Sequence, residues 1–223
     1  MAHMKTTSIN QIKNNPSSKI NPDSIKTIFQ ALITVLVIVA ISTLVNVSIH
    51  LDYVYLNSSV GEISITENLQ LVMLAISSWC FLSIYLKNEN VSHAAILISG
   101  FFFVMIIREM DFLFDMIHHG FWVLPALSVA VLSCFKACKG GKNTVNEMAC
   151  ILQIPDMKLL MVAVVLLLVY SRLYGMGSFW HSVMGAHYVR DVKNISEESM
   201  ELLCYCLIAM SSVRVRHTLK SNS

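Results

Sequence analysis

The stretch AAILISGFFFVMIIREMDFLFD, residues 94–115, decides the fold class of this chain. Its first part, as far as Ile107, carries no charge, and the sequence then changes to Arg108, Glu109, Asp111 and Asp115. A soluble domain has about 25% charged residues, whereas this chain of 223 residues has 13%, with 55% hydrophobic residues. Its solvent is therefore expected to be mostly lipid, and charged residues at membrane depth indicate a functional site.

Six segments are apolar enough to cross a membrane, for which a helix needs about 20 residues. We therefore predict an all-α polytopic membrane bundle of about six transmembrane helices. The expected spans are residues 28–50, 66–86, 93–117, 121–138, 157–175 and 196–213. We expect one transmembrane domain over residues 26–217, a flexible tail with a tag remnant over 1–25, and a short tail over 218–223.

The distribution of charge predicts the orientation of these spans. With the N-terminus inside, the inner segments hold twelve of the sixteen lysines and arginines, as the positive-inside rule requires. The outer segments hold ten of the fourteen acidic residues. We therefore predict that both termini are cytoplasmic, and that the chain is an integral protein of a bacterial inner membrane. Because this rule accounts for the basic residues, we predict no nucleic-acid partner.

Three of the expected helices carry a charge at the same depth. At a rise of 1.5 Å per residue, Arg108, Arg172 and Glu201 each lie about 20 Å from the inner boundary of a core about 30 Å thick. Charges at that depth are stable only when they face one another in the bundle interior. We therefore expect Arg172 to contact a carboxylate of this group, in a polar cavity that opens outward.

Histidines and carboxylates gather at the same outer ends, and both are ligands of divalent metal ions. The Asp115-x-x-His118 pair is a shortened relative of the Glu-x-x-His pairs that bind metals in di-iron bundles. We therefore predict a site for a divalent metal, namely zinc, iron or manganese. Its expected ligands are Asp111, Asp115, His118, His119, His181 and His187.

The leading hypothesis is a metal-dependent hydrolase or transferase that acts on a membrane lipid, or on a lipid-linked or anionic substrate, at the outer leaflet. Glu198 or Glu201 would be the general base, with a metal-bound water as nucleophile. Arg108, Arg172 or Arg190 would bind the anionic headgroup or the oxyanion of the substrate.

Other classes remain open. The carboxylates at membrane depth also suit a cation or proton transporter or channel with a path through Glu109, Asp111, Glu201 and Arg172. A non-catalytic membrane subunit would instead bind a partner at its outer face, and its buried charges would form a purely structural network. A bis-histidine haem site is disfavoured, because the histidines lie at span ends and in loops. The tyrosines are interpreted as anchors at the membrane interface.

Two serines, Ser77 and Ser78, follow Glu67 along the second span and are expected to face the same site. Serine, aspartate and several histidines in a helical membrane bundle resemble the site of alkaline ceramidases and adiponectin-receptor-like hydrolases. The chain departs from that superfamily, since six spans are expected where seven are usual and the last span has no His-x-x-x-His pair. The resemblance is one of residue types, and no membership follows from it.

Overall fold

The computed structural model describes residues 22–55, 64–116 and 118–221, which form helices and no strand. The predicted fold class, an all-α membrane bundle, is thereby confirmed. Most of the predicted tail, residues 1–21, lies outside the described residues. The α-helices are α2 (Pro22–His50), α3 (Ile65–Lys87), α4 (Ser92–Glu109), α5 (Asp111–Asp115), α6 (Val123–Lys139), α7 (Lys142–Leu152), α8 (Pro155–Val165), α9 (Ser171–Gly175), α10 (Gly177–Met184) and α11 (Arg190–Ser221).

Short turns of other helix types join some of these elements. Five-residue π-helical segments extend α2 over Leu51–Tyr55 and connect α8 to α9 over Leu166–Tyr170. By its internal contacts the chain divides into two units, residues 1–40 and residues 41–223. In the first unit the described part is the start of α2, whose large apolar side chains, such as Phe29 and Leu36, are exposed. Such a surface is typical of a helix that faces lipid.

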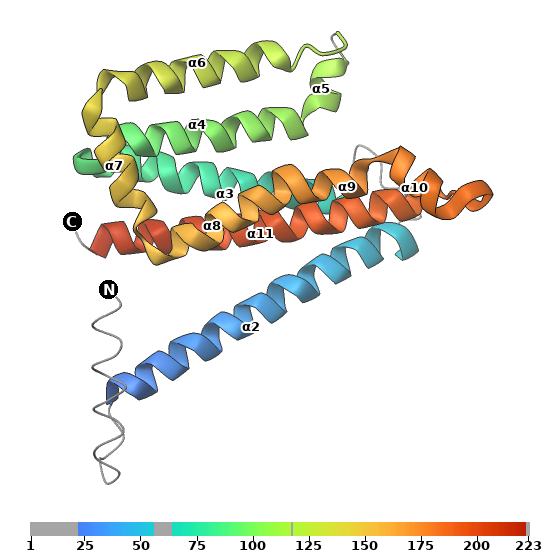
Figure 1. Ribbon diagram of the computed structural model, residues 1–223, viewed down its shortest axis with the longest axis horizontal. Coiled ribbons are helices and arrows are strands. Elements are labelled where there is room, and N and C mark those ends of the chain that lie inside the picture. The colour runs from blue at the N-terminus through green and yellow to red at the C-terminus, as the bar shows by residue number, and fades with distance from the viewer. Residues whose placement is uncertain (1–21, 56–63, 117, 222–223) are drawn as a thin grey trace. The chain divides into compact units, whose positions relative to one another are not determined.

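In the second unit α3 lies between α4 and α11, α4 also packs against α6, and α11 also packs against α8 (Figure 1). The core of this layer contains Leu74 and Phe81 from α3 with Phe102 from α4. Where α4 meets α6, a Cβ atom added to Gly100 would lie 2.5 Å from the Cβ atom of Ser133. Small residues at such positions let membrane helices approach closely.

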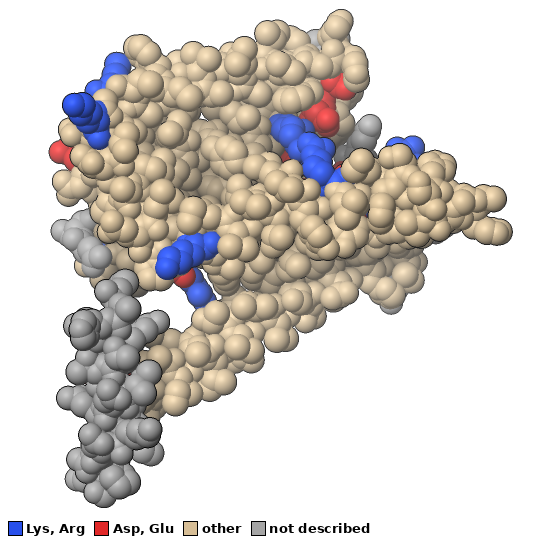
Figure 2. Space-filling model, in the orientation of Figure 1, with Lys and Arg blue, Asp and Glu red and all other residues tan. Residues whose placement is uncertain are grey.

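The direction of each helix brings most acidic side chains of the second unit to one end and most basic side chains to the other (Figure 1). At the acidic end α3 and α11 begin and α4 ends; at the basic end α3 and α11 end and α7 crosses. Figure 2 shows acidic side chains over α5 and basic ones over the corner between α6 and α7. The acidic end holds Glu67, Glu109, Asp111, Asp115, Asp191, Glu197, Glu198 and Glu201, and the basic end holds Lys87, Lys136, Lys139, Lys142, Lys158, Arg214, Arg216 and Lys220.

By length and composition, four described helical segments could cross a membrane: Asp23–Val54, Ile65–Lys87, Glu89–Glu109 and Pro155–Gly175. The pair α6 and α7, bent by 104°, counts as a fifth if it forms one broken span. The expected sixth span lies within α11, where only residues 202–213 separate Glu201 from Arg214. Twelve helical residues extend about 18 Å, short of the hydrocarbon thickness. Length and composition thus support four or five of the six predicted spans.

Candidate functional site

A pocket of about 260 Å³ lies at the acidic end of the second unit, and we call it the acidic pocket. Three helices and the short α5 contribute side chains to it. It is lined by Glu67, Gln70, Glu109, Asp111, Phe112, Asp115 and Glu198. Among the residues that the structure describes, the lining thus contains five carboxylates and no basic side chain. Of the predicted site residues, this pocket brings together Asp111, Asp115 and Glu198.

Gln70 connects two of the helices that form the acidic pocket. It follows Glu67 by three positions on α3, so both side chains lie on one face of that helix. Its Nε2 atom donates a hydrogen bond of 2.7 Å to Oε2 of Glu198 on α11. Gln70 is 1% exposed, so this bond holds the Glu198 carboxylate against α3 at the wall of the pocket.

Glu109 is held by two donors from opposite sides. Arg108 approaches it with Nη2 at 2.8 Å from Oε1, and the hydroxyl of Tyr205 donates to the same oxygen at 2.6 Å. Tyr205 comes from α11 and is 1% exposed. The interpretation of the tyrosines as interface anchors is therefore wrong for Tyr205, because its ring is buried and its hydroxyl has a half-buried carboxylate as partner.

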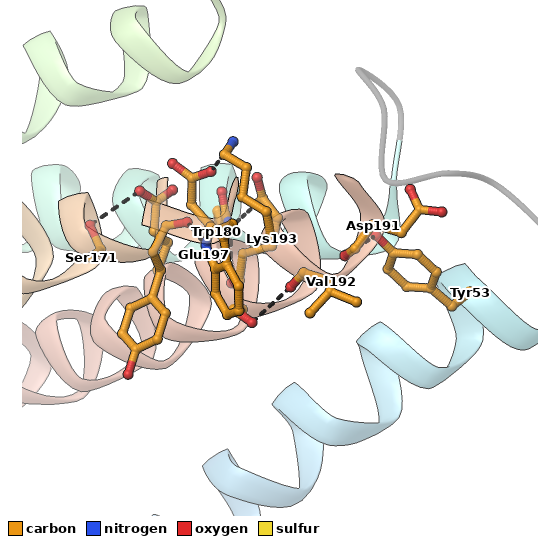
Figure 3. A network of polar contacts seen from close by, with 12 residues as sticks. Tyr53, Ser171, Trp180, Asp191, Val192, Lys193 and Glu197 are labelled. Atoms are coloured by element: carbon orange, nitrogen blue, oxygen red, sulfur yellow. Dashed lines mark hydrogen bonds and ion pairs between the residues drawn. The ribbon is translucent and has the colours of Figure 1, made fainter. Parts of the chain in front are cut away.

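Glu201 lies deeper than the acidic pocket, four residues before Tyr205 on α11 and 7% exposed. It accepts a hydrogen bond of 3.3 Å from the Oγ atom of Ser171 on α9, drawn as a dashed line in Figure 3. Arg108 and Glu109 lie within electrostatic reach of it. Of the three charges predicted at one depth, Arg108 and Glu201 thus lie near each other.

Asp115 is shared between the acidic pocket and the loop that follows α5. Its Oδ1 accepts a bond of 2.7 Å from the backbone N–H of Gly120, and its Oδ2 lies 2.8 Å from Nδ1 of His119. The Gly120 bond and, to a smaller degree, His119 lower the pKa of the Asp115 carboxyl below its usual range. Gly120 has a φ of 80°, which favours glycine at this point of the loop.

The remaining predicted site residues lie outside the acidic pocket. Arg172, Arg190, His118, His181 and His187 are exposed. The ring of His181 stacks on Tyr188 with 3.8 Å between centroids, and the Nδ1 atom of His118 lies 2.9 Å from the carbonyl oxygen of His119. His119 has a side chain that is 96% exposed. The six predicted metal ligands are therefore not assembled into one centre.

The predicted contact of Arg172 with a carboxylate is wrong. Within the described ranges Arg172 forms no ion pair, because the preceding residue, Ser171, occupies the position that faces α11 and bonds to Glu201. Across those same ranges, no three His, Cys, Asp or Glu side chains lie close enough to hold one metal ion. The metal itself stays a prediction.

Polar contacts also surround the start of α11 and the short helices α9 and α10 (Figure 3). Lys193 forms an ion pair with Glu197 at 2.8 Å between Nζ and Oε2. The hydroxyl of Tyr53 donates to the backbone carbonyl of Asp191 at 3.4 Å, and Nε1 of Trp180 donates to the carbonyl of Tyr174 at 2.7 Å.

Sequence reasoning missed Gln70, Tyr205 and Ser171 as parts of the site. The available signal was spacing, since Gln70 shares a helix face with Glu67, and Tyr205 shares one with Glu201. The two serines expected to face the site do not line the acidic pocket. Ser77 bonds to the carbonyl of Met73 on its own helix, and Ser78 bonds to Ser99 on α4.

The fold and the pocket define a class, an all-α membrane protein with an acidic pocket at one end of its helical bundle. Comparison of the chain with protein-family models, with curated proteins and with solved structures finds no match.

Proposed function

We propose that this membrane protein binds a cation in the acidic pocket, as a transporter or channel for cations or protons does at one of its faces. The observation that carries the proposal is the lining, in which the described residues supply five carboxylates and no basic side chain. Carboxylates grouped at the end of a membrane bundle repel one another, and a bound cation or proton relieves that repulsion. An anionic substrate would increase the repulsion, which favours a positively charged ligand.

The spacing of these carboxylates favours a hydrated metal ion, or a cation that carries its own hydrogen atoms as an ammonium group does. No three ligating groups among the described residues are close enough to coordinate a bare ion directly. A volume of about 260 Å³ has room for a cation with several waters. A lining of oxygen atoms suits hard ions such as Mg²⁺, Ca²⁺ and Mn²⁺ better than soft ones. Among the three metals expected from the sequence, this lining favours manganese.

Binding can be measured by titrating the purified protein in detergent with Mn²⁺ and following the free ion by electron paramagnetic resonance. Glu198→Gln and Asp111→Asn each remove one carboxyl group from the acidic pocket, and each should weaken binding at least about tenfold. The matched control is Asp191→Asn, which removes an exposed carboxylate at the same end of the bundle but outside the pocket lining. It should bind like the unchanged protein.

Equal losses in Glu198→Gln and Asp191→Asn would contradict the proposal, since they would show only a general surface charge effect. Absence of any saturable binding would contradict it too. Transfer can be tested separately in liposomes that contain the protein. There, Glu201→Gln should reduce cation or proton flux, because Glu201 is the buried carboxylate beyond Glu109.

The metal-dependent hydrolase or transferase is the second candidate. The observation that favours it is that two of its predicted ligands, Asp111 and Asp115, line the same pocket as its predicted base, Glu198. In this case Mn²⁺ or Zn²⁺ should be needed for release of a product from a lipid substrate, and Glu198→Gln should remove that release while the metal stays bound. Flux without any turnover would favour the first candidate.

A further inference from the structure

An apolar groove of about 350 Å³ lies between α4, α7 and α8, and all of its lining residues are apolar. Two of the three helices belong to segments that are apolar enough to span a membrane. Figure 2 shows the surface hollowed between α4 and α8. The groove is lined by Leu97 and Phe101 from α4, Met148 and Leu152 from α7, and Leu160 and Val164 from α8, among others.

Two arginines lie beyond the groove toward the acidic end. On α4, Arg108 follows Phe101 by seven residues, which is two turns along the same face and about 10 Å. On the other wall, the groove residue Met161 comes directly after buried Leu160. Arg172 likewise comes directly after a buried residue, Ser171. Arg108 and Arg172 are the basic residues in the last turns of α4 and α9.

The two arginines differ in their partners. Arg108 is bonded to Glu109, which itself lines the acidic pocket. Arg172 has no ion pair among the described residues, although it belongs to a membrane-spanning segment where an unpaired charge is costly. Its guanidinium has donors for a phosphate, a group that arginine binds well. Along the bundle, the apolar groove is therefore followed by two guanidinium groups and then by the acidic pocket.

We propose that the groove, the two arginines and the acidic pocket together bind a phospholipid with a primary ammonium in its headgroup. One acyl chain lies in the groove, the phosphate contacts Arg172 beside Arg108, and the ammonium group reaches the carboxylates of the acidic pocket. The Arg108–Glu109 pair, at 2.8 Å, joins the phosphate position to the pocket. The inference rests on the proposed function, since it names an ammonium group as a cation that the pocket takes.

The test is native mass spectrometry of the purified protein with equal amounts of dioleoyl-phosphatidylethanolamine and its N-acetyl derivative, which lacks the positive charge. The ammonium lipid should be retained at least about tenfold better, the size expected for a charge-assisted contact. Arg172→Gln and Val164→Trp should each lower its retention, by removing the phosphate contact and by filling the groove. Glu198→Gln should abolish the preference over the N-acetyl lipid.

The controls are Lys220→Gln, at an exposed basic residue of the other end, and Val169→Trp, at an exposed position outside the groove. Equal retention of both lipids, or equal losses in variants and controls, would overturn the inference. The inference would also be overturned if the unchanged protein formed a dimer that Val164→Trp dissociates, since a second copy of the chain would then occupy the groove. If Mn²⁺ binds and the lipids are not distinguished, this inference fails and the proposed function stands; if Mn²⁺ does not bind, the proposed function fails.

Discussion

At the scale of single residues, the site depends on donors that fix three of its carboxylates. Glu198 has Gln70, Glu109 has Arg108 and Tyr205, and Glu201 has Ser171. A buried carboxylate without such partners would cost several kcal/mol. Each donor comes from a different helix than its acceptor, with the exception of Arg108. The carboxylates therefore hold the helix ends together as well as lining a pocket.

Tyr205→Phe tests this arrangement at one oxygen atom. The change keeps the ring in the core and removes the hydroxyl that donates to Glu109 at 2.6 Å. Hydrogen bonds to charged groups contribute about 1.5–3 kcal/mol, so the free energy of unfolding should fall by about that amount. The measurement is reversible unfolding in mixed micelles. Tyr170→Phe, at an exposed tyrosine, should change it by less than about 0.5 kcal/mol; a similar loss in both variants would contradict the account.

Asp115 should make the loop after α5 sensitive to acid. Its pKa is lowered in the folded protein, chiefly by the Gly120 N–H. A group with a lowered folded pKa contributes stability that is present above its ordinary pKa of 3.8 and is lost as the pH falls through the lower, folded value. Hydrogen exchange at the Gly120 amide should therefore lose protection in that acid range. Asp115→Asn should show little change there, and protection that does not vary with pH in the unchanged protein would contradict the prediction.

At the scale of elements, α3 depends on a residue outside itself. Asp52 is buried, and its carboxylate accepts bonds from the backbone N–H groups of Ile65 and Thr66 and from the Thr66 hydroxyl. Ser64 adds a bond to the N–H of Glu67. These acceptors satisfy the first free N–H groups of the helix that carries Glu67 and Gln70.

Asp52→Ala should therefore destabilise the start of α3 and loosen the acidic pocket. We expect a loss of about 2 kcal/mol or more, since a cap contributes about 0.5–2 kcal/mol and buried donors are left without partners. Unfolding in mixed micelles would measure it. Ser128→Ala, at an exposed hydroxyl that bonds within its own helix, is the control and should be nearly neutral. A neutral Asp52→Ala would show that the cap contributes little.

The contact of α4 with α6 gives a second test at this scale. Gly100→Ala should cost about 1–3 kcal/mol, because the new methyl group overlaps the side chain of Ser133. The double variant Gly100→Ala with Ser133→Gly removes the opposing Cβ atom and should recover a large part of the loss. Lack of any recovery, measured by the same unfolding experiment, would place the strain elsewhere.

The elements also show what hydropathy can and cannot predict. Apolar runs predicted where α3, α4 and α8 lie, and the direction of successive spans brought Asp111, Asp115 and Glu198 to one end. Rotation about a helix axis was not predictable for residues 157–175, because apolar residues surround that segment on all sides. The depth of Arg172 could thus be counted from the sequence. The sequence did not predict that Ser171, and not Arg172, would face α11. For Gln70 and Tyr205, only the neighbouring helix reveals the partner.

At the scale of the whole molecule, orientation across the membrane is a prediction from charge. The basic end should face the cytoplasm and the acidic pocket should open on the other side. Reporter fusions after Lys142 and after Ser223 should both give a cytoplasmic signal. An external signal at either point would contradict the predicted orientation, and with it the side from which a cation would enter the pocket.

The account's central claim is that the acidic pocket holds a cation, and locating that cation tests it most directly. Crystals of the protein grown with Mn²⁺ can be measured at a wavelength where manganese gives an anomalous signal. We predict one dominant peak among Glu198, Asp111 and Asp115, which should weaken in Glu198→Gln and stay unchanged in Asp191→Asn. A peak at His181 and His187, or no peak in the pocket at saturating Mn²⁺, would contradict the claim.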